Sequence, residues 1–291
     1  MLECGTISCE RDKKNLPMKW LLAYILALVA LQLMFGNINV EFFSFPIGLV
    51  LGVAGIALLY VAHREFGGGR FITYFRSARM AYVLLALVAC CCVAGGAVPA
   101  FARFTTSVPF VGLLVALLAH LALVMMHRLR KFSLGRDGAF ACVHLGIWLA
   151  LFSGMAGAAD TARLHALLAV GEDVSTAYDE NGCELPLRHT MRLQRFAVER
   201  NPANNTVVQF RAWLLVDDEP CELAVNSPHS VGLGEDIYLM SYHLNSSGTD
   251  VKDCVIQVVH EPWKYVTLLG IVMLLLGVVW TVKTIKVEGK V

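Results

Sequence analysis

The chain has 291 residues and a formal net charge of +1, and 57% of its residues are hydrophobic against 16% that are charged. This apolar excess, with a mean hydropathy of +0.61, indicates an integral membrane protein. A net charge so close to zero argues against a nucleic-acid partner, because such a partner needs a strongly basic surface.

Hydropathy predicts an α-helical integral membrane protein with six transmembrane helices. A helix needs roughly 20 apolar residues to cross the hydrocarbon. Six stretches meet this length, at about residues 18–36, 44–63, 79–99, 107–127, 138–158 and 264–282. The first is longer than the apolar part of a signal peptide and no small-residue cleavage site follows it, so we expect it to be retained as a first span.

Basic residues predict the orientation of these helices. Segments rich in Lys and Arg alternate with segments that hold few, and the rich ones are residues 11–19, 64–79, 128–136 and 283–290. Basic loops stay in the cytoplasm. We therefore expect a multi-pass protein of the cell inner (cytoplasmic) membrane, with both termini in the cytoplasm and the long segment after the fifth span on the outer side.

That long segment is predicted to form an extracytoplasmic β-rich domain between helices 5 and 6. Apolar and polar residues alternate in it, and turn compositions recur at hairpin-like intervals, for example at 201–205 and 245–248. Residues 161–170 fit either a short helix or a strand. The expected division is a cytoplasmic tail (1–17), a five-helix membrane region (18–158), the outer domain (159–263), and a last helix with a cytoplasmic tail (264–291).

A histidine inside the fifth span, His144, is the first candidate for a functional site, because a polar ring in hydrocarbon is costly. It lies about 9 Å from the cytoplasmic edge of the span. His120 lies at nearly the same depth on the preceding, antiparallel span, so the two imidazoles could hold a haem iron between helices. Alternatively, each ring only hydrogen-bonds a neighbouring helix, and for His120 this second reading is favoured.

Other polar residues predict less. His63 and His127 sit at the cytoplasmic ends of their spans, where the interface can solvate them. The sequence supports no Ser-His-Asp or paired-carboxylate arrangement, so no catalytic residue is assigned. A disulfide is expected among Cys183, Cys221 and Cys254, which leaves one thiol over.

Several short motifs stand in a fixed order along the chain. They are His144 with Gly146 and Gly154, the pair Gly171-Glu172, the run from Leu185 to Val198, the stretch 224–228, the stretch 237–242, and Val259 to Pro262 ahead of the last span. In this order, from about Arg76 to Val282, the sequence resembles the ResB family, also called CcsB, of System II cytochrome c maturation. It departs from the family pattern at Leu187, Ser227 and Glu261.

The resemblance implies a function. ResB-like proteins act with a CcsA-type membrane protein to move haem b across the membrane and attach it to apocytochrome c. It implies that His144 is the family's membrane histidine, an axial ligand to haem in transit. It also implies a non-catalytic or shared subunit of a cytochrome c haem lyase (synthase) complex. A thiol-reducing, thioredoxin-like protein is a further partner compatible with this role.

Two other functions stay open at this point. The chain could be a membrane haem b electron-transfer anchor that uses His120 and His144 together. It could also be a scaffold that stabilises the partner without haem, with His144 as a packing residue.

Overall fold

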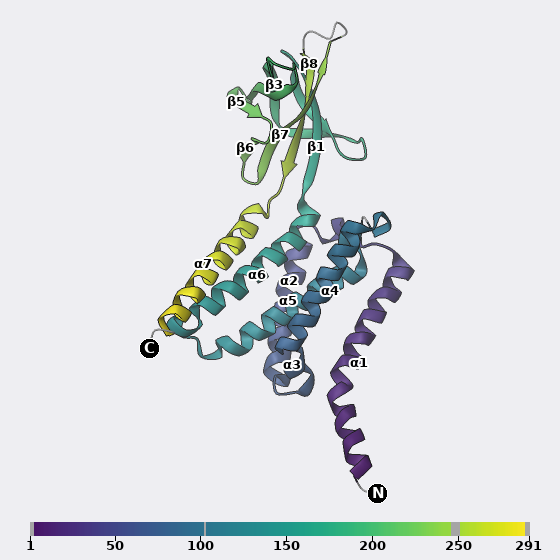
Figure 1. Ribbon diagram of the computed structural model, residues 1–291. Helices are drawn as coiled ribbons and strands as arrows, with labels where there is room; N and C mark the ends of the chain where they lie inside the picture. The colour runs from purple at the N-terminus through teal and green to yellow at the C-terminus, as the bar shows by residue number, and fades with distance from the viewer. Residues whose placement is uncertain (1–2, 102, 246–250, 289–291) are drawn as a thin grey trace. The chain divides into compact units, whose positions relative to one another are not determined.

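The computed structural model describes residues 3–101, 103–245 and 251–288 (Figure 1). It divides into a helical unit, Met1–Ala159 with Val266–Val291, and a sheet unit, Asp160–Tyr265. Within the described residues the helices are α1 (Glu3–Phe35), η1 (Val40–Phe43), α2 (Ile47–Phe66), α3 (Arg70–Phe75), α4 (Ala78–Ala97), η2 (Pro99–Phe101), η3 (Phe104–Thr106), α5 (Val108–Arg128), η4 (Leu129–Lys131), α6 (Leu134–Asp160) and α7 (Lys264–Glu288).

The predicted fold class, an α-helical protein with six transmembrane helices, is wrong. Among the described residues, five helices are long and apolar enough to cross a membrane: α2, α4, α5 with η4, α6 and α7. Over the residues of α1 whose side chains are described, Lys19–Phe35, the apolar helix is shorter than these five. Five such helices are compatible with a membrane protein. The fold is mixed α and β, however, because a β-sheet lies between α6 and α7, the fourth and fifth of these helices.

Serine caps begin two of the long helices. The Ser77 hydroxyl accepts a hydrogen bond from the Met80 N–H at the start of α4, and the Ser107 hydroxyl accepts one from the Phe110 N–H at the start of α5. Each cap pairs an N–H that lacks a partner inside its helix. The apolar faces of α4 and α5 then meet α1 in one core around the fully buried Leu84.

Helices α6 and α7 lie side by side (Figure 1) and pack through glycines. A methyl group built on Gly146 would fall 2.7 Å from the carbonyl oxygen of Gly270, so the two backbones are in contact there. The hydroxyls of Ser153 and Thr267 share a hydrogen bond of 2.8 Å between the same helices. Small residues allow this close approach in membrane helices. It holds α7 beside the helix that carries His144.

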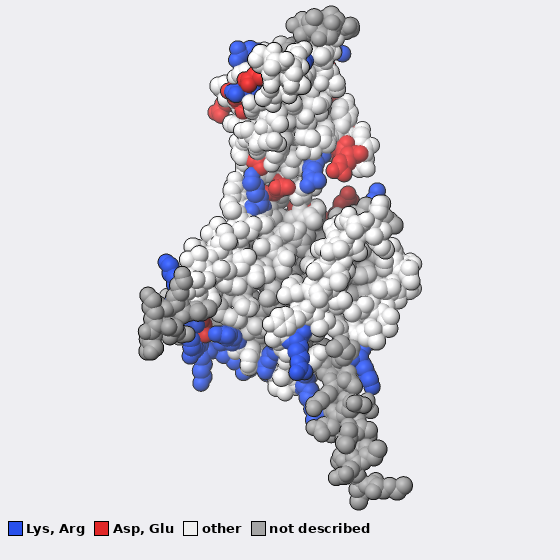
Figure 2. Space-filling model, viewed as in Figure 1, with Lys and Arg blue, Asp and Glu red and all other residues white. Residues whose placement is uncertain are grey.

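Positive charge gathers at one end of the helical unit, whereas the flanks of the helices carry little charge (Figure 2). The α2–α4 and α5–α6 connections, residues 64–79 and 128–136, supply basic residues to this end. For the basic residues at 11–14 and 286–288 the structure describes the backbone and not the side chains, and Lys290 lies outside the described residues. This is the pattern from which the cytoplasmic side was inferred, and that orientation stays a prediction.

The sheet unit is an antiparallel sheet of eight described strands in the order β5-β4-β3-β2-β1-β8-β7-β6. The strands are β1 (Ala162–Ala169), β2 (Asp173–Tyr178), β3 (Glu184–Arg200), β4 (Val207–Val216), β5 (Glu219–Ala224), β6 (His229–Gly232), β7 (Glu235–Leu244) and β8 (Val251–His260). Residues 161–170, open between helix and strand in the sequence, thus contain a strand. Most of the turn expected at 245–248 lies outside the described residues.

The two ends of the sheet meet, because β5 contacts both β6 and β7. This curvature encloses an apolar core on one face of every long strand. In β1, Ala166 and Leu168 point into the core, whereas Leu167 between them is 51% exposed. Cys221 and Cys254 belong to the same core.

Candidate functional site

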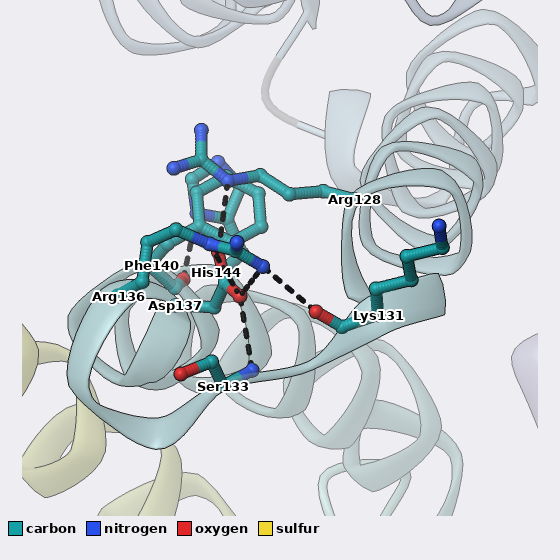
Figure 3. A network of polar contacts seen from close by, with 7 residues as sticks. All are labelled: Arg128, Lys131, Ser133, Arg136, Asp137, Phe140 and His144. Carbon is teal, nitrogen blue, oxygen red and sulfur yellow. Dashed lines mark hydrogen bonds and ion pairs between the residues drawn. The ribbon is translucent and has the colours of Figure 1, made fainter.

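A buried carboxylate, Asp137, organises the turn between α5 and α6 (Figure 3). Arg136 donates to it from Nε at 3.2 Å and from Nη2 at 2.8 Å, and the Ser133 backbone N–H donates at 3.1 Å. The Arg128 Nε, at the end of α5, lies 3.8 Å away. Because Ser133 precedes α6, the carboxylate pairs an N–H at the helix start, where the helix dipole favours negative charge.

His144 lies about two turns further along α6 and is half-buried. Its Nδ1 is 3.0 Å from the carbonyl oxygen of Phe140. A carbonyl oxygen can only accept, so Nδ1 carries the proton, and in the neutral ring the lone pair is at Nε2. Metal-bound histidines usually donate their other N–H in this way. The arrangement therefore offers Nε2 to a ligand.

Phe140 contacts both His144 and Arg128 (Figure 3). Its ring stacks on the His144 ring, with centroids 3.8 Å apart and planes 30° apart. The guanidinium carbon of Arg128 lies 4.3 Å from the same Phe140 centroid. A cation over an aromatic face is attracted by about 0.5–2 kcal/mol. The orientation of the His144 ring is thus supported from α5 as well as from α6.

Sequence reasoning missed Asp137, Phe140 and Arg128. The spacing of Phe140 and His144 by four residues is a visible signal, because such residues are neighbours on a helix. A second signal is the spacing of Ser133 and Asp137 by four residues just before an apolar run, which is typical of a helix start. Arg128 has no such signal, since only the turn of the chain between α5 and α6 brings it to the ring.

His120 has a different environment. It is 4% exposed, and its Nδ1 is 2.6 Å from the carbonyl oxygen of Phe75, at the end of α3. His120 therefore ties α5 to α3, while His144 bonds within its own helix. This geometry favours the hydrogen-bonding role of His120, and shared binding of one iron by both rings stays a prediction.

An apolar groove of about 460 Å³ lies in the same unit, among α1, α3, α4 and α5. Its lining is rich in aromatic residues: Trp20, Tyr24, Phe71, Tyr74 and Phe75. It has room for a flat apolar group but offers no imidazole. In the part of the chain that the structure describes, no three His, Cys, Asp or Glu side chains come together as a metal site.

The three cysteines of the sheet unit are free thiols in the structure. Cys183 is exposed, whereas Cys221 and Cys254 are buried. Burial raises the pKa of Cys221 and raises the pKa of Cys254 to about 12, so neither is a reactive thiolate at neutral pH. A disulfide among the three stays a prediction.

Comparison with known proteins gives one family. Residues 133–254 match the model of the ResB-like family, which confirms the resemblance seen in the sequence. No curated protein matches. A solved structure of the cytochrome c haem lyase CcmF aligns with 81% of this chain at 14% identity and a TM-score of 0.37, and the alignment spans 45% of that protein's length.

Proposed function

We propose that this protein is a cytochrome c biogenesis subunit that, with a CcsA-type partner, transports haem across the membrane and supports its attachment to apocytochrome c. The ResB-like match supports the proposal, because residues 133–254 contain the turn around Asp137, His144 and most of the sheet unit. Haem is the cargo in this proposal rather than a permanent cofactor.

One observation carries the proposal: the Phe140 carbonyl accepts the Nδ1 proton of His144 at 3.0 Å and leaves Nε2 as the basic nitrogen. Imidazole is a standard axial ligand of haem iron. The Phe140 ring, stacked on the imidazole, restricts its rotation. A single, oriented ligand of this kind suits haem that must be held and then passed on, since a second ligand from the partner can come and go.

Arginines beside the ring suit the acidic edge of haem. Asp137 already accepts hydrogen bonds from Arg136 and from the Ser133 N–H. Arg128 is 3.8 Å from the same carboxylate and stays over the Phe140 ring. The N–H groups of Arg128 that do not face Asp137 can donate to a haem propionate, because a guanidinium pairs strongly with a carboxylate.

The proposal also assigns each end of the protein to one side of the membrane. The basic end of the helices would face the cytoplasm of a cell with an inner membrane, so His144 lies nearer the cytoplasmic surface. The sheet unit would lie on the outer side, where apocytochrome c receives haem. Formation of the thioether bonds would belong mainly to the partner, whose second axial ligand and outer haem site complete the complex.

Substitution of the two membrane histidines tests this function. The chain is expressed with a CcsA-type partner and a c-type cytochrome, and covalent haem in the cytochrome is measured by peroxidase staining. His144→Ala should lower covalent haem about tenfold or more, because a metal ligand is lost. His120→Phe, the matched control from the neighbouring helix, should keep most of it.

Two other results would contradict the proposed function. Full maturation with His144→Ala, in a protein that still folds, would overturn the haem-ligand role and leave only the scaffold function. Equal loss with both variants, together with stable bis-imidazole haem in the chain alone, would favour the electron-transfer anchor instead.

A further inference from the structure

His63, at the end of α2, is a buried polar side chain without a partner. It is 4% exposed rather than solvated at the interface. Neither Nδ1 nor Nε2 makes a hydrogen bond within the described residues. Leaving a polar group buried and unpaired costs about 1–3 kcal/mol. We therefore expect this ring to hydrogen-bond to a ligand.

One imidazole and two guanidiniums, from three elements, act on this ring. His127, near the end of α5, lies edge-on to it, with ring centroids 5.9 Å apart. Arg76, after α3, donates from Nη1 to the Nδ1 of His127 at 3.0 Å and to the Gly67 carbonyl at 3.2 Å. Arg130, in η4, supplies the second guanidinium whose positive charge acts on His63.

Negative charge is scarce at the same place. In the described part of the chain no carboxylate is among the charges that act on His63 or His127. Glu65, the acid nearest in sequence, lies 3.7 Å from Arg64. The ends of α2 and α5 contribute roughly half a negative charge each. Against the two guanidiniums this leaves roughly one uncompensated positive charge.

We propose that His63, His127, Arg76 and Arg130 form a binding site for a phosphate-type oxyanion. A metal ion is disfavoured, because the two guanidiniums repel it and cannot act as ligands. A phosphate presents several acceptor oxygens, which suits N–H donors converging from α2, the α3–α4 connection and η4. The His63 ring would then have the acceptor that the protein itself does not supply.

Two sources share this chemistry: the terminal phosphate of an anionic phospholipid, which the choline of phosphatidylcholine blocks, and a free phosphate ion. Residues at the end of a membrane helix lie near lipid headgroups, and Arg130 and His127 are exposed there. Bound in either form, the anion would join α2, the α3–α4 connection and η4. Since the proposal uses none of the His144 contacts, it stands whether or not the chain handles haem.

Thermal unfolding of the full chain in lipid nanodiscs tests the proposal. One arm uses phosphatidylcholine nanodiscs titrated with inorganic phosphate against chloride of equal ionic strength. The other arm uses nanodiscs that contain phosphatidic acid, without added phosphate. A ligand that binds only the folded state raises the unfolding temperature, so we expect a rise in at least one arm, and the arm identifies the source.

Three variants test whether the rise in unfolding temperature comes from the proposed site. For each variant, the unfolding temperature with ligand is compared with that of the same variant without ligand. Arg76→Gln should weaken the apparent affinity about tenfold or more, as expected for loss of a charge-assisted hydrogen bond. His63→Leu should unfold at the same or a higher temperature without ligand and respond less to it. Arg64→Gln, an exposed arginine on the same helix end, should respond like the wild type.

Two results would overturn the proposal. One is the absence of any rise in both arms for the wild-type protein. The other is a rise that Arg76→Gln and Arg64→Gln retain equally, because it would reflect general attraction of anions to the basic end.

Discussion

Substitution of Gly146 by alanine should loosen the pair of helices that carries the candidate site. The added methyl would lie 2.6 Å from the Leu274 backbone nitrogen and 2.7 Å from the Gly270 carbonyl oxygen. Both neighbours are backbone atoms, which cannot rotate away as a side chain would. Reaching an ordinary contact of 3.4 Å requires α6 and α7 to separate by about 0.8 Å.

The expected cost is moderate. Overpacking of this kind costs about 1–3 kcal/mol, and alanine regains about 0.8–1 kcal/mol over glycine as a helix former. A net loss of up to about 2 kcal/mol remains. For a chain of this size each kcal/mol shifts the unfolding temperature by roughly 2–4 °C, so Gly146→Ala should unfold several degrees lower.

Gly154, on the same helix, is the matched control. A methyl group there meets nothing within 4 Å, so Gly154→Ala gains helix propensity at no steric cost and should unfold at the same or a higher temperature. Unfolding of both purified variants in one detergent, followed by tryptophan fluorescence, gives the comparison. Equal unfolding temperatures for the two variants would refute the close packing of α6 on α7.

Three further predictions concern groups with defined environments. Maleimide should label the exposed Cys183 in the native protein. Cys254 should react only after unfolding, because burial raises its pKa to about 12. Peptide mass spectrometry measures the labelling of both cysteines, and equal labelling rates in the native protein would contradict the burial of Cys254. The hydrogen bond from His189 holds the pKa of Asp217 below its usual value, so this pair stabilises the sheet above the ordinary aspartate pKa of about 3.9 and loses that effect as the pH falls through the lowered value. His189→Gln should therefore move the acid transition of the strand signal in circular dichroism to higher pH, and an unmoved transition would argue against the pair. His120→Phe should lower the unfolding temperature, because it removes the hydrogen bond to the half-buried Phe75 carbonyl, a loss of about 1 kcal/mol or more, and an unchanged temperature would contradict the hydrogen bond.

Hydropathy predicted most of the helical unit. The stretches around 44–63, 79–99, 107–127, 138–158 and 264–282 correspond to long apolar helices, since length and apolarity are local properties of the sequence. The first stretch corresponds to α1, whose part with described side chains, Lys19–Phe35, is shorter than the other five helices. Residues 161–170 could not be decided from their own pattern, because pairing with β8 makes them a strand.

The candidate site was predictable only in part. His144 could be singled out because a histidine in an apolar run is rare. Its ring orientation depends on Phe140, which the sequence shows, and on Arg128, which arrives through the turn around Asp137. The burial of His63 depends on contacts with other helices, so its position near a helix end suggested solvation and gave no sign of an unpaired ring.

The most direct test of the account is chemical rescue at position 144. The chain is purified with the proposed CcsA-type partner, as wild type and as His144→Gly, from cells grown with and without imidazole. Bound haem is measured by pyridine haemochrome absorbance. If His144 ligates haem, His144→Gly should hold little haem, and haem should be recovered when free imidazole replaces the missing ring. Wild-type haem content in His144→Gly without imidazole would contradict it.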